Sequence, residues 1–152
     1  MKCILMRHAM QGWDKYDTLE EVAQQGATNS NHPNAGQFNK IIQKVKEISP
    51  EEFSILTSEE YLAKLTGRIL AQELGYVGRI EEDPLLEYEI RDKNLRFSEK
   101  DNSLRLIVSH EPPLKRFFLD NCGIDLWRMG IYNADAHMIE LEPVRYIGKI
   151  TE

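Results

Sequence analysis

Two stretches far apart in the chain decide the fold: residues 1–8 read MKCILMRH, and residues 104–110 read LRLIVSH. Each is a short, mostly apolar run that ends at a histidine, either His8 or His110. A continuous apolar run of this length is typical of a strand that is buried on both faces, as in a parallel sheet. In an α/β protein, ligands bind at the carboxyl ends of such strands. We therefore expect the two histidines to be halves of one site.

The residue types at these two strand ends indicate a phosphoryl group as the ligand. A guanidinium from Arg7 would bind two phosphoryl oxygens, and His110 would donate a further hydrogen bond. The imidazole of His8 can attack phosphorus and hold the phosphoryl group covalently, which divides one difficult displacement into two easier ones. Its attacking nitrogen must be neutral, and its other ring nitrogen then needs an acceptor such as a backbone carbonyl. Each histidine is alternatively an ordinary surface or core residue, and the residues alone leave both interpretations open.

Length and composition limit the class of protein. The chain has 152 residues, 41% hydrophobic and 29% charged, which predicts one globular domain over residues 1–152. The formal net charge of -6 disfavours binding to nucleic acid or to an anionic membrane. The first apolar run stops at Arg7, too short for a signal peptide or a membrane span, and cysteine is sparse, so the expected location is the cytoplasm. The histidines form no His-x-x-x-His pair, so we expect no metal and no other cofactor.

Strand and helix patterns alternate between the two histidines. One apolar face at helical spacing predicts a helix that follows Asn34 and is closed by Pro50. Residues 53–56 predict the next strand. Thr57 as N-cap and Glu60 at N3 fit a capping box, which predicts a helix directly after that strand. This alternation predicts an α/β layer fold.

The remaining segments carry weaker patterns. The polar stretch 11–34 predicts mostly loop with a short helix around 19–23, and the charged stretch 79–103 predicts only short elements. Residues 104–108 predict the third strand. Pro112 and Pro113 predict the start of a helix, and residues 137–141 and 144–147 predict a terminal hairpin.

Several stretches, in order, resemble the histidine phosphatase superfamily, the phosphoglycerate-mutase-like proteins. Residues 5–9 (LMRHA) resemble the family's Arg-His-Gly or Arg-His-Ala signature, and residues 108–112 (VSHEP) resemble its second-histidine motif. The His-x-Pro form is similar to the small bacterial phosphohistidine phosphatases, the short branch. Residues 55–58 (ILTS) resemble the strand and serine that begin the motif Ser-Pro-x-x-Arg-Ala-x-x-Thr-Ala, with Ala63 and Thr66 at the expected spacings. The resemblance implies a three-layer α/β/α sandwich whose mainly parallel sheet has a C-terminal hairpin or antiparallel edge strand.

The resemblance also implies roles for individual residues. His8 would be the phosphorylated nucleophile, with Arg7 and His110 in the phosphate pocket. A carboxylic acid would protonate the leaving oxygen, and Glu87, in the stretch Leu85-Leu86-Glu87, matches the family's usual acid in place. Such an acid works only if it keeps its proton near neutral pH. Glu87 alternatively belongs to a solvated acidic face, and the short branch can act without a dedicated acid because a phosphohistidine leaving group needs less help.

The chain departs from the family pattern at the second guanidinium. Counting from Ser58, the motif's proline is Glu59 and its arginine is Leu62. An aliphatic side chain cannot make that arginine's charge-assisted hydrogen bonds to a phosphate. Lys64 and Arg68 point to other faces of the expected helix. Four basic residues on neighbouring segments are candidates to replace the arginine: Arg91, Arg96, Lys115 and Arg116.

Four further side chains carry separate expectations. Glu111, beside the second histidine, would repel a phosphate if it turned inward, so we expect it to face outward. His32 either reaches the site or is a solvated loop residue. His137 in the terminal hairpin is expected to be structural, and Cys3 is expected to be a small core residue.

Two functions from different classes follow. The first is a metal-independent phosphatase that acts through phospho-His8 on a small phosphomonoester or a phosphorylated protein side chain. The second is a catalytically weak or inactive relative that binds a phosphorylated ligand or partner, because the motif arginine is Leu62. A mutase is less expected because the chain lacks long inserts that would enclose an exchanging substrate. The shortness of the loop over residues 79–103 predicts an open site, which favours bulky or protein-borne phosphate.

Overall fold

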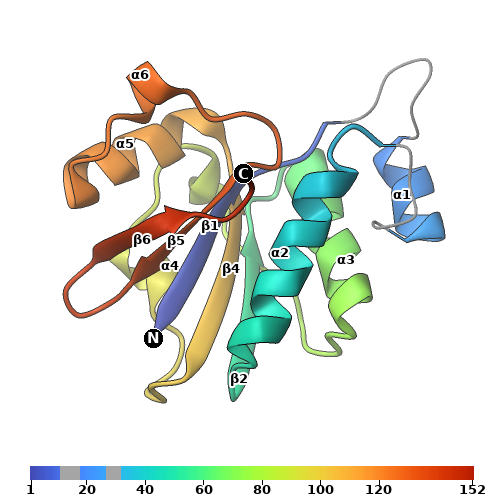
Figure 1. The fold of residues 1–152 in the computed structure, drawn as a ribbon, viewed down its shortest axis with the longest axis horizontal. Helices are drawn as coiled ribbons and strands as arrows, with labels where there is room; N and C mark the ends of the chain where they lie inside the picture. Colours follow the sequence, from blue (N-terminus) through green and yellow to red (C-terminus); the bar gives the residue numbers. More distant parts are fainter. Residues whose placement is uncertain (11–17, 27–31) are drawn as a thin grey trace.

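The fold is built on one mixed β-sheet. A computed structural model describes residues 1–10, 18–26 and 32–152, so the predicted loop residues 11–17 and 27–31 lie outside the described part. In the described part the sheet has six strands in the order β3-β2-β4-β1-β5-β6 (Figure 1). Strands β1 to β4 run parallel, whereas β5 is antiparallel to β1 and β6 is antiparallel to β5. Their bounds are β1 (Lys2–Arg7), β2 (Glu52–Thr57), β3 (Glu81–Glu82), β4 (Ser103–Ser109), β5 (Ala136–Glu140) and β6 (Arg145–Lys149).

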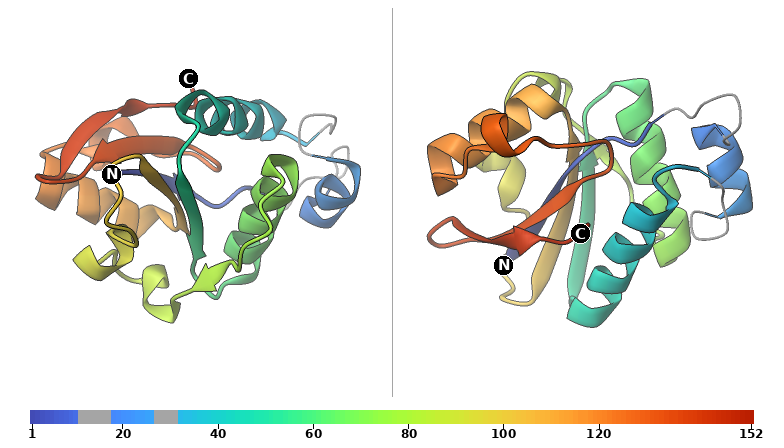
Figure 2. Two further views of the ribbon diagram at one scale, coloured as in Figure 1. Left: turned by 90° about the horizontal axis from the view of Figure 1, so that it is seen from below. Right: turned by 45° about the horizontal axis from the view of Figure 1, so that its top comes forward.

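Helices cover both faces of this sheet. Helices α1, α2 and α3 lie on one side of the sheet, and α5 with η2, α4 and α6 lies on the other (Figures 1 and 2). Ile4 and Leu5 are neighbours in β1 and are both fully buried, yet each packs into a different apolar cluster. A strand with buried side chains on both faces needs helices on both sides, so the three-layer α/β/α sandwich is confirmed. The helices are α1 (Leu19–Gln25), α2 (Ala35–Ile48), α3 (Tyr61–Leu74), the 3-10 helix η2 (Pro84–Glu87), α4 (Asp92–Leu95), α5 (Glu111–Cys122) and α6 (Leu126–Met129).

The two helices α2 and α5 lie where the sequence predicts them. Phe38 and Ile41 of α2 are fully buried, and Ser49 ends the helix in the left-handed conformation just before Pro50. Helix α5 follows His110, as predicted from its prolines, and buries its aromatic side chains against the second cluster. The terminal hairpin is also confirmed. The long apolar faces leave little choice about which side of each element is buried.

The start of α3 differs from the prediction. Thr57 does not cap the helix; it is buried as the last residue of β2. The Ser58 N–H donates to the backbone of β4 at 3.2 Å, which continues the strand direction beyond Thr57. Glu60 is the N-cap instead, and its Oε2 accepts from the N–H groups of Leu62 and Ala63 at 2.9 and 3.1 Å. The predicted capping box is therefore wrong, and the helix begins later than expected.

Helix α3 lies unusually close to β2. A Cβ atom at Gly67 would lie 2.7 Å from the Thr57 methyl group, so only glycine allows this approach without a shift. The close contact places the first turns of α3 beside the carboxyl end of β1, where the chain continues to His8. Among the described residues, no helix is both long and apolar enough to span a lipid bilayer.

Candidate functional site

Three adjacent parallel strands bring the two histidines together. Strands β1 and β4 end in register, at Arg7 and Ser109. Strand β2 pairs with β4 on its other side and ends one position earlier. His8, Ser58 and His110 therefore follow three neighbouring strand ends, at the upper edge of the sheet in Figure 1. This is the edge at which ligands bind in α/β sheets.

The two imidazole rings lie against each other at this edge. Their centroids are 5.1 Å apart, and the rings meet edge to face at 61°. Nδ1 of His8 lies 3.0 Å from the Ala9 carbonyl oxygen. Because a carbonyl oxygen can only accept, Nδ1 carries a proton, and in the neutral ring Nε2 then holds the lone pair. The backbone acceptor expected for His8 is thus present.

His110 is held by a serine hydroxyl. Its Nε2 lies 2.7 Å from Oγ of Ser58, which is fully buried. Burial, and after it the nearby charge of His8, lowers the pKa of His110 below the ordinary histidine value of 6.5. The His110 ring therefore stays neutral to a lower pH than a free histidine does.

The backbone that follows β1 is fixed by polar side chains from two helices. The Ala9 N–H donates to Thr66 Oγ1 of α3 at 3.0 Å. The Met10 N–H donates to Oδ1 of Asn34, the residue before α2, at 2.8 Å. These contacts hold the loop that carries His8 in one position, which is what a nucleophile needs for productive geometry.

Arg7 contacts an acidic side chain. Its Nη1 donates to the Ile131 carbonyl at 2.9 Å and forms an ion pair with Glu111 Oε2, also at 2.9 Å. Glu111 is the first residue of α5, and Lys115, one turn later, pairs with the same carboxylate. The Lys115 hydrogen bond, and then the charge of Arg7, keep the pKa of Glu111 below its usual range. The prediction that Glu111 faces outward is wrong, because the two cations hold its carboxylate beside Arg7.

No candidate replacement for the missing arginine contacts the histidines among the described contacts. Leu62 itself packs against the apolar cluster under α3. The four candidate basic residues have partners elsewhere: Arg91 pairs with Asp83, Arg96 pairs with Glu142, Arg116 donates to the Tyr88 carbonyl, and Lys115 pairs with Glu111. Of these, Lys115 is connected to Arg7 through a shared carboxylate.

Two glutamates lie near the histidines. Glu87, the sequence candidate, is the exposed last residue of η2, and the Ser109 hydroxyl ties η2 to β4 by donating to the Leu86 carbonyl at 2.6 Å. Glu60 was not singled out for the site from the sequence. Its carboxylate oxygen and the ring nitrogens of His8 and His110 all lie within 4.8 Å of one another. The capping-box prediction placed Glu60 at N3, where its side chain would turn back toward the N-cap and not toward the histidines.

The other two histidines are buried. His32 is buried: its Nδ1 accepts from the Asn34 N–H at 3.0 Å, and its Nε2–H donates to the Met10 carbonyl at 2.6 Å. The interpretation of His32 as a solvated loop residue is therefore wrong. His137 is buried on β5, where Nδ1 lies 2.9 Å from the Tyr146 hydroxyl. Burial lowers the pKa of His137 to about 4.

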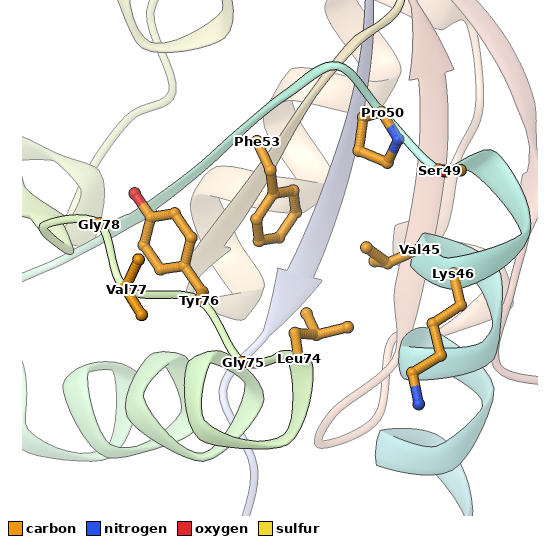
Figure 3. Close-up of a pocket in the computed structure, with 10 residues that line it drawn as sticks. All are labelled: Val45, Lys46, Ser49, Pro50, Phe53, Leu74, Gly75, Tyr76, Val77 and Gly78. Carbon is orange, nitrogen blue, oxygen red and sulfur yellow. The ribbon is translucent and has the colours of Figure 1, made fainter.

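A cavity of about 560 Å³ lies away from these residues, near the ends of α2 and α3 (Figure 3). Its walls are largely apolar, with Val45, Phe53, Leu74 and Tyr76 facing the opening, and Lys46 is the charged residue in its lining. Phe53 lies near the amino end of β2, whereas the histidines follow the carboxyl ends of the strands. The cavity is therefore separate from the histidine site.

Solved structures with the same fold cover nearly the whole chain. No protein-family model and no curated protein sequence matches it. The putative phosphohistidine phosphatase SixA from Agrobacterium tumefaciens is similar with a TM-score of 0.65 and 15% identity, over 99% of this chain and 97% of that one. The protein histidine phosphatase SixA complexed with tungstate is similar with a TM-score of 0.62 and 13% identity, over 99% and 97%. Phosphoserine phosphatase from Entamoeba histolytica, in complex with 3-phosphoglyceric acid, is similar with a TM-score of 0.57 and 14% identity, again over 99% and 97%.

Identities this low establish likeness of fold. The TM-scores above 0.6 and the near-complete overlap with both SixA structures show this likeness. The chain therefore has the fold of the histidine phosphatase superfamily, as its sequence motifs implied.

Proposed function

We propose that this protein is a metal-independent phosphatase that forms a phosphohistidine on His8. The observation that carries the proposal is the His8 ring, whose Nδ1–H donates to the Ala9 carbonyl at 3.0 Å and leaves Nε2 as a nucleophile. Nε2 attacks phosphorus while the bond from phosphorus to the leaving oxygen breaks. Water then attacks the phosphorus and gives up a proton, the phosphorus–nitrogen bond breaks, and His8 regains its neutral form as phosphate leaves.

Arg7 and His110 would stabilise the charge that develops on the phosphoryl oxygens. Both described side-chain contacts of Arg7 involve Nη1, so the N–H groups of Nη2 are left for a ligand. His110 lies edge to face with His8 and is fixed by Ser58, which suits a donor that must already be in place when charge develops.

Glu87 is the proposed acid for the leaving oxygen. It stands at the end of η2, which the Ser109 hydroxyl anchors directly before His110, and it would act in its protonated form. Glu60 is closer to both histidines, but its Oε2 already accepts two backbone N–H groups at the start of α3. A phosphorylated nitrogen as leaving group would reduce the need for any such acid.

The alternative is a binding protein with little turnover. It depends on Leu62, because losing one charged donor from such a pocket costs on the order of 2–4 kcal/mol in the transition state. The solved structures that resemble this chain include the protein histidine phosphatase SixA and a phosphoserine phosphatase. The phosphatase is therefore the better-supported function. Its substrate class stays broad: a phosphorylated small molecule or a phosphorylated protein side chain.

Hydrolysis of p-nitrophenyl phosphate, with and without EDTA, tests the proposal. The wild type should hydrolyse this substrate in the presence of EDTA. The His8→Ala substitution should abolish hydrolysis and leave the circular dichroism spectrum unchanged. Activity that survives His8→Ala would contradict the mechanism. An inert wild type together with an active Leu62→Arg variant would support the binding protein. Val77→Arg is the matched control, because it adds the same charge at a side chain that is 99% exposed.

A further inference from the structure

The histidine edge also carries a set of metal-ligating atoms. Among the described residues, the group of this kind consists of His8, Glu60 and His110, whose ligand atoms all lie within 4.8 Å of one another. All three side chains are partly buried, so they are shielded and still reachable from solvent. Two imidazoles and one carboxylate form a ligand set that zinc accepts, with a fourth coordination position left open.

The free atoms of two of these side chains suit this use. Only one oxygen of Glu60, Oε2, accepts the two cap hydrogen bonds from the N–H groups of Leu62 and Ala63. Oε1 takes no part in these two bonds. The cap fixes the carboxylate at the start of α3. His8 donates its Nδ1–H to a backbone carbonyl, which is the usual orientation of a metal-ligating histidine and leaves Nε2 for the metal.

The separation of the ligand atoms is close to what an ion requires. Around a tetrahedral zinc ion with bonds of about 2.0–2.2 Å, neighbouring ligand atoms lie about 3.4 Å apart. Since every pair of ligand atoms lies within 4.8 Å, no pair has to approach by more than about 1.4 Å to reach this spacing. Side-chain rotation supplies a movement of this size, although His110 would then exchange its contact with Ser58 for the ion if it binds through Nε2.

The charges around the two histidines are of both signs: Glu60 and Glu87 favour positive charge at His110, and Arg7 disfavours it. Position 62, two residues after Glu60, holds an uncharged leucine. The guanidinium of Arg7 is the nearest basic group in sequence to His8, and Glu111 neutralises it through the ion pair at 2.9 Å. The three ligands thus offer one negative charge and two neutral nitrogens to the ion.

We propose that His8, Glu60 and His110 bind one zinc ion, which inhibits the protein by occupying the nucleophile. The inhibitory part rests on the proposed phosphatase function, because a His8 nitrogen that is bound to zinc has no lone pair left to attack phosphorus. Zinc and a phosphoryl group therefore exclude each other at this edge. Binding itself does not depend on turnover.

Binding is measured first, on the full-length chain after dialysis against EDTA and then against metal-free buffer. Isothermal titration calorimetry with ZnCl2 should give one site, and CoCl2 should give the visible absorption of a low-symmetry Co(II) complex with nitrogen and oxygen ligands. His8→Ala and Glu60→Gln should each weaken zinc binding at least tenfold; glutamine keeps an oxygen for the helix cap. Glu59→Gln is the matched control, because it removes the same charge from the adjacent, exposed residue. Zinc binding that both site variants retain would overturn the proposal.

Hydrolysis of p-nitrophenyl phosphate separates this proposal from the function on which it partly rests. Turnover in EDTA that zinc suppresses, at the concentration where calorimetry shows binding, supports both. Turnover with no zinc binding overturns the metal site and leaves the phosphatase intact. Zinc binding through His8 and Glu60 without turnover supports the site and contradicts the phosphatase.

Discussion

Arg7 and Glu111 form an ion pair with a nitrogen–oxygen distance of 2.9 Å. Arg7 directly precedes His8 at the end of β1, and Glu111 directly follows His110 at the start of α5. The carboxylate also pairs with Lys115, so it is held by two cations. Any anion that approaches Arg7 must therefore compete with a carboxylate that belongs to the protein itself.

Glu111→Gln should strengthen anion binding. Removing the carboxylate charge frees Arg7, and the partly exposed ion pair has a strength of about 1 kcal/mol, so the dissociation constant for inorganic phosphate should fall about fivefold. Calorimetric titration with phosphate measures this. Glu47→Gln, an equal change of charge at an exposed position on α2, is the control. Unchanged or weaker phosphate binding in Glu111→Gln would show that the pair does not compete with the ligand.

Thr66→Val should impair turnover more than substrate binding. The Thr66 hydroxyl accepts from the Ala9 N–H at 3.0 Å and donates to the Leu62 carbonyl at 2.6 Å, so it positions the loop that carries His8. Urea unfolding should show a loss of about 1–2 kcal/mol, because a buried N–H loses its acceptor. Steady-state kinetics should show a fall in kcat with little change in KM, and Thr66→Ser should restore both measurements. A stability loss with unchanged kcat would indicate a purely structural hydroxyl.

His8→Ala should raise the pKa of His110. Burial is the main reason for the low pKa of His110, and the charge of His8 is the next. Without that charge, the titration midpoint of His110 should move up toward 6.5. NMR of the imidazole ring protons against pH measures the shift. His137, with a pKa of about 4, serves as an internal reference in the same spectra. A midpoint that stays in place would mean that the two rings do not interact electrostatically.

His137 should make the fold sensitive to acid. Burial lowers its pKa from 6.5 to about 4, so between these values the unfolded chain binds more protons than the folded one. The free energy of unfolding should be highest above pH 6.5 and should fall by about 3 kcal/mol by pH 4 from this group alone.

Urea unfolding of the wild type and of His137→Phe between pH 7 and pH 4.5 tests this prediction. Phenylalanine fits among Phe118 and Tyr146 and cannot take up a proton. The variant should therefore lose less stability than the wild type as the pH falls. Parallel curves for the two proteins would count against His137 as the acid-sensitive group.

The main layers of the fold could be predicted because their signals are local. The apolar runs of β1 and β4 and the apolar face of α2 each lie within one segment, and each specifies which side is buried. Strand β3 and helix α6 have only two and four residues, too few for a periodic pattern. These elements form because longer neighbours support them.

The site divides in the same way. His8 and His110 stand directly after strong strand patterns, so their meeting follows from the parallel pairing of β1 and β4. Glu60 and Glu111 were misjudged because their directions depend on where helices begin and on which cations lie nearby. Neither the exact start of a helix nor the identity of the neighbouring cations can be predicted from a short stretch of sequence.

Local sequence patterns were sufficient to predict the layers and the edge at which the histidines meet, and short motifs resemble the family whose fold the chain shares. Hydrophobic periodicity along single segments is enough for the layers and for this edge, because burial is decided residue by residue along a strand or helix. Three contacts follow from tertiary packing instead: Glu111 lies against Arg7, Glu60 lies beside both histidines, and Thr66 holds the Ala9 backbone from 57 residues away. Such contacts depend on the relative positions of elements that are remote in sequence, and local sequence patterns do not predict these positions.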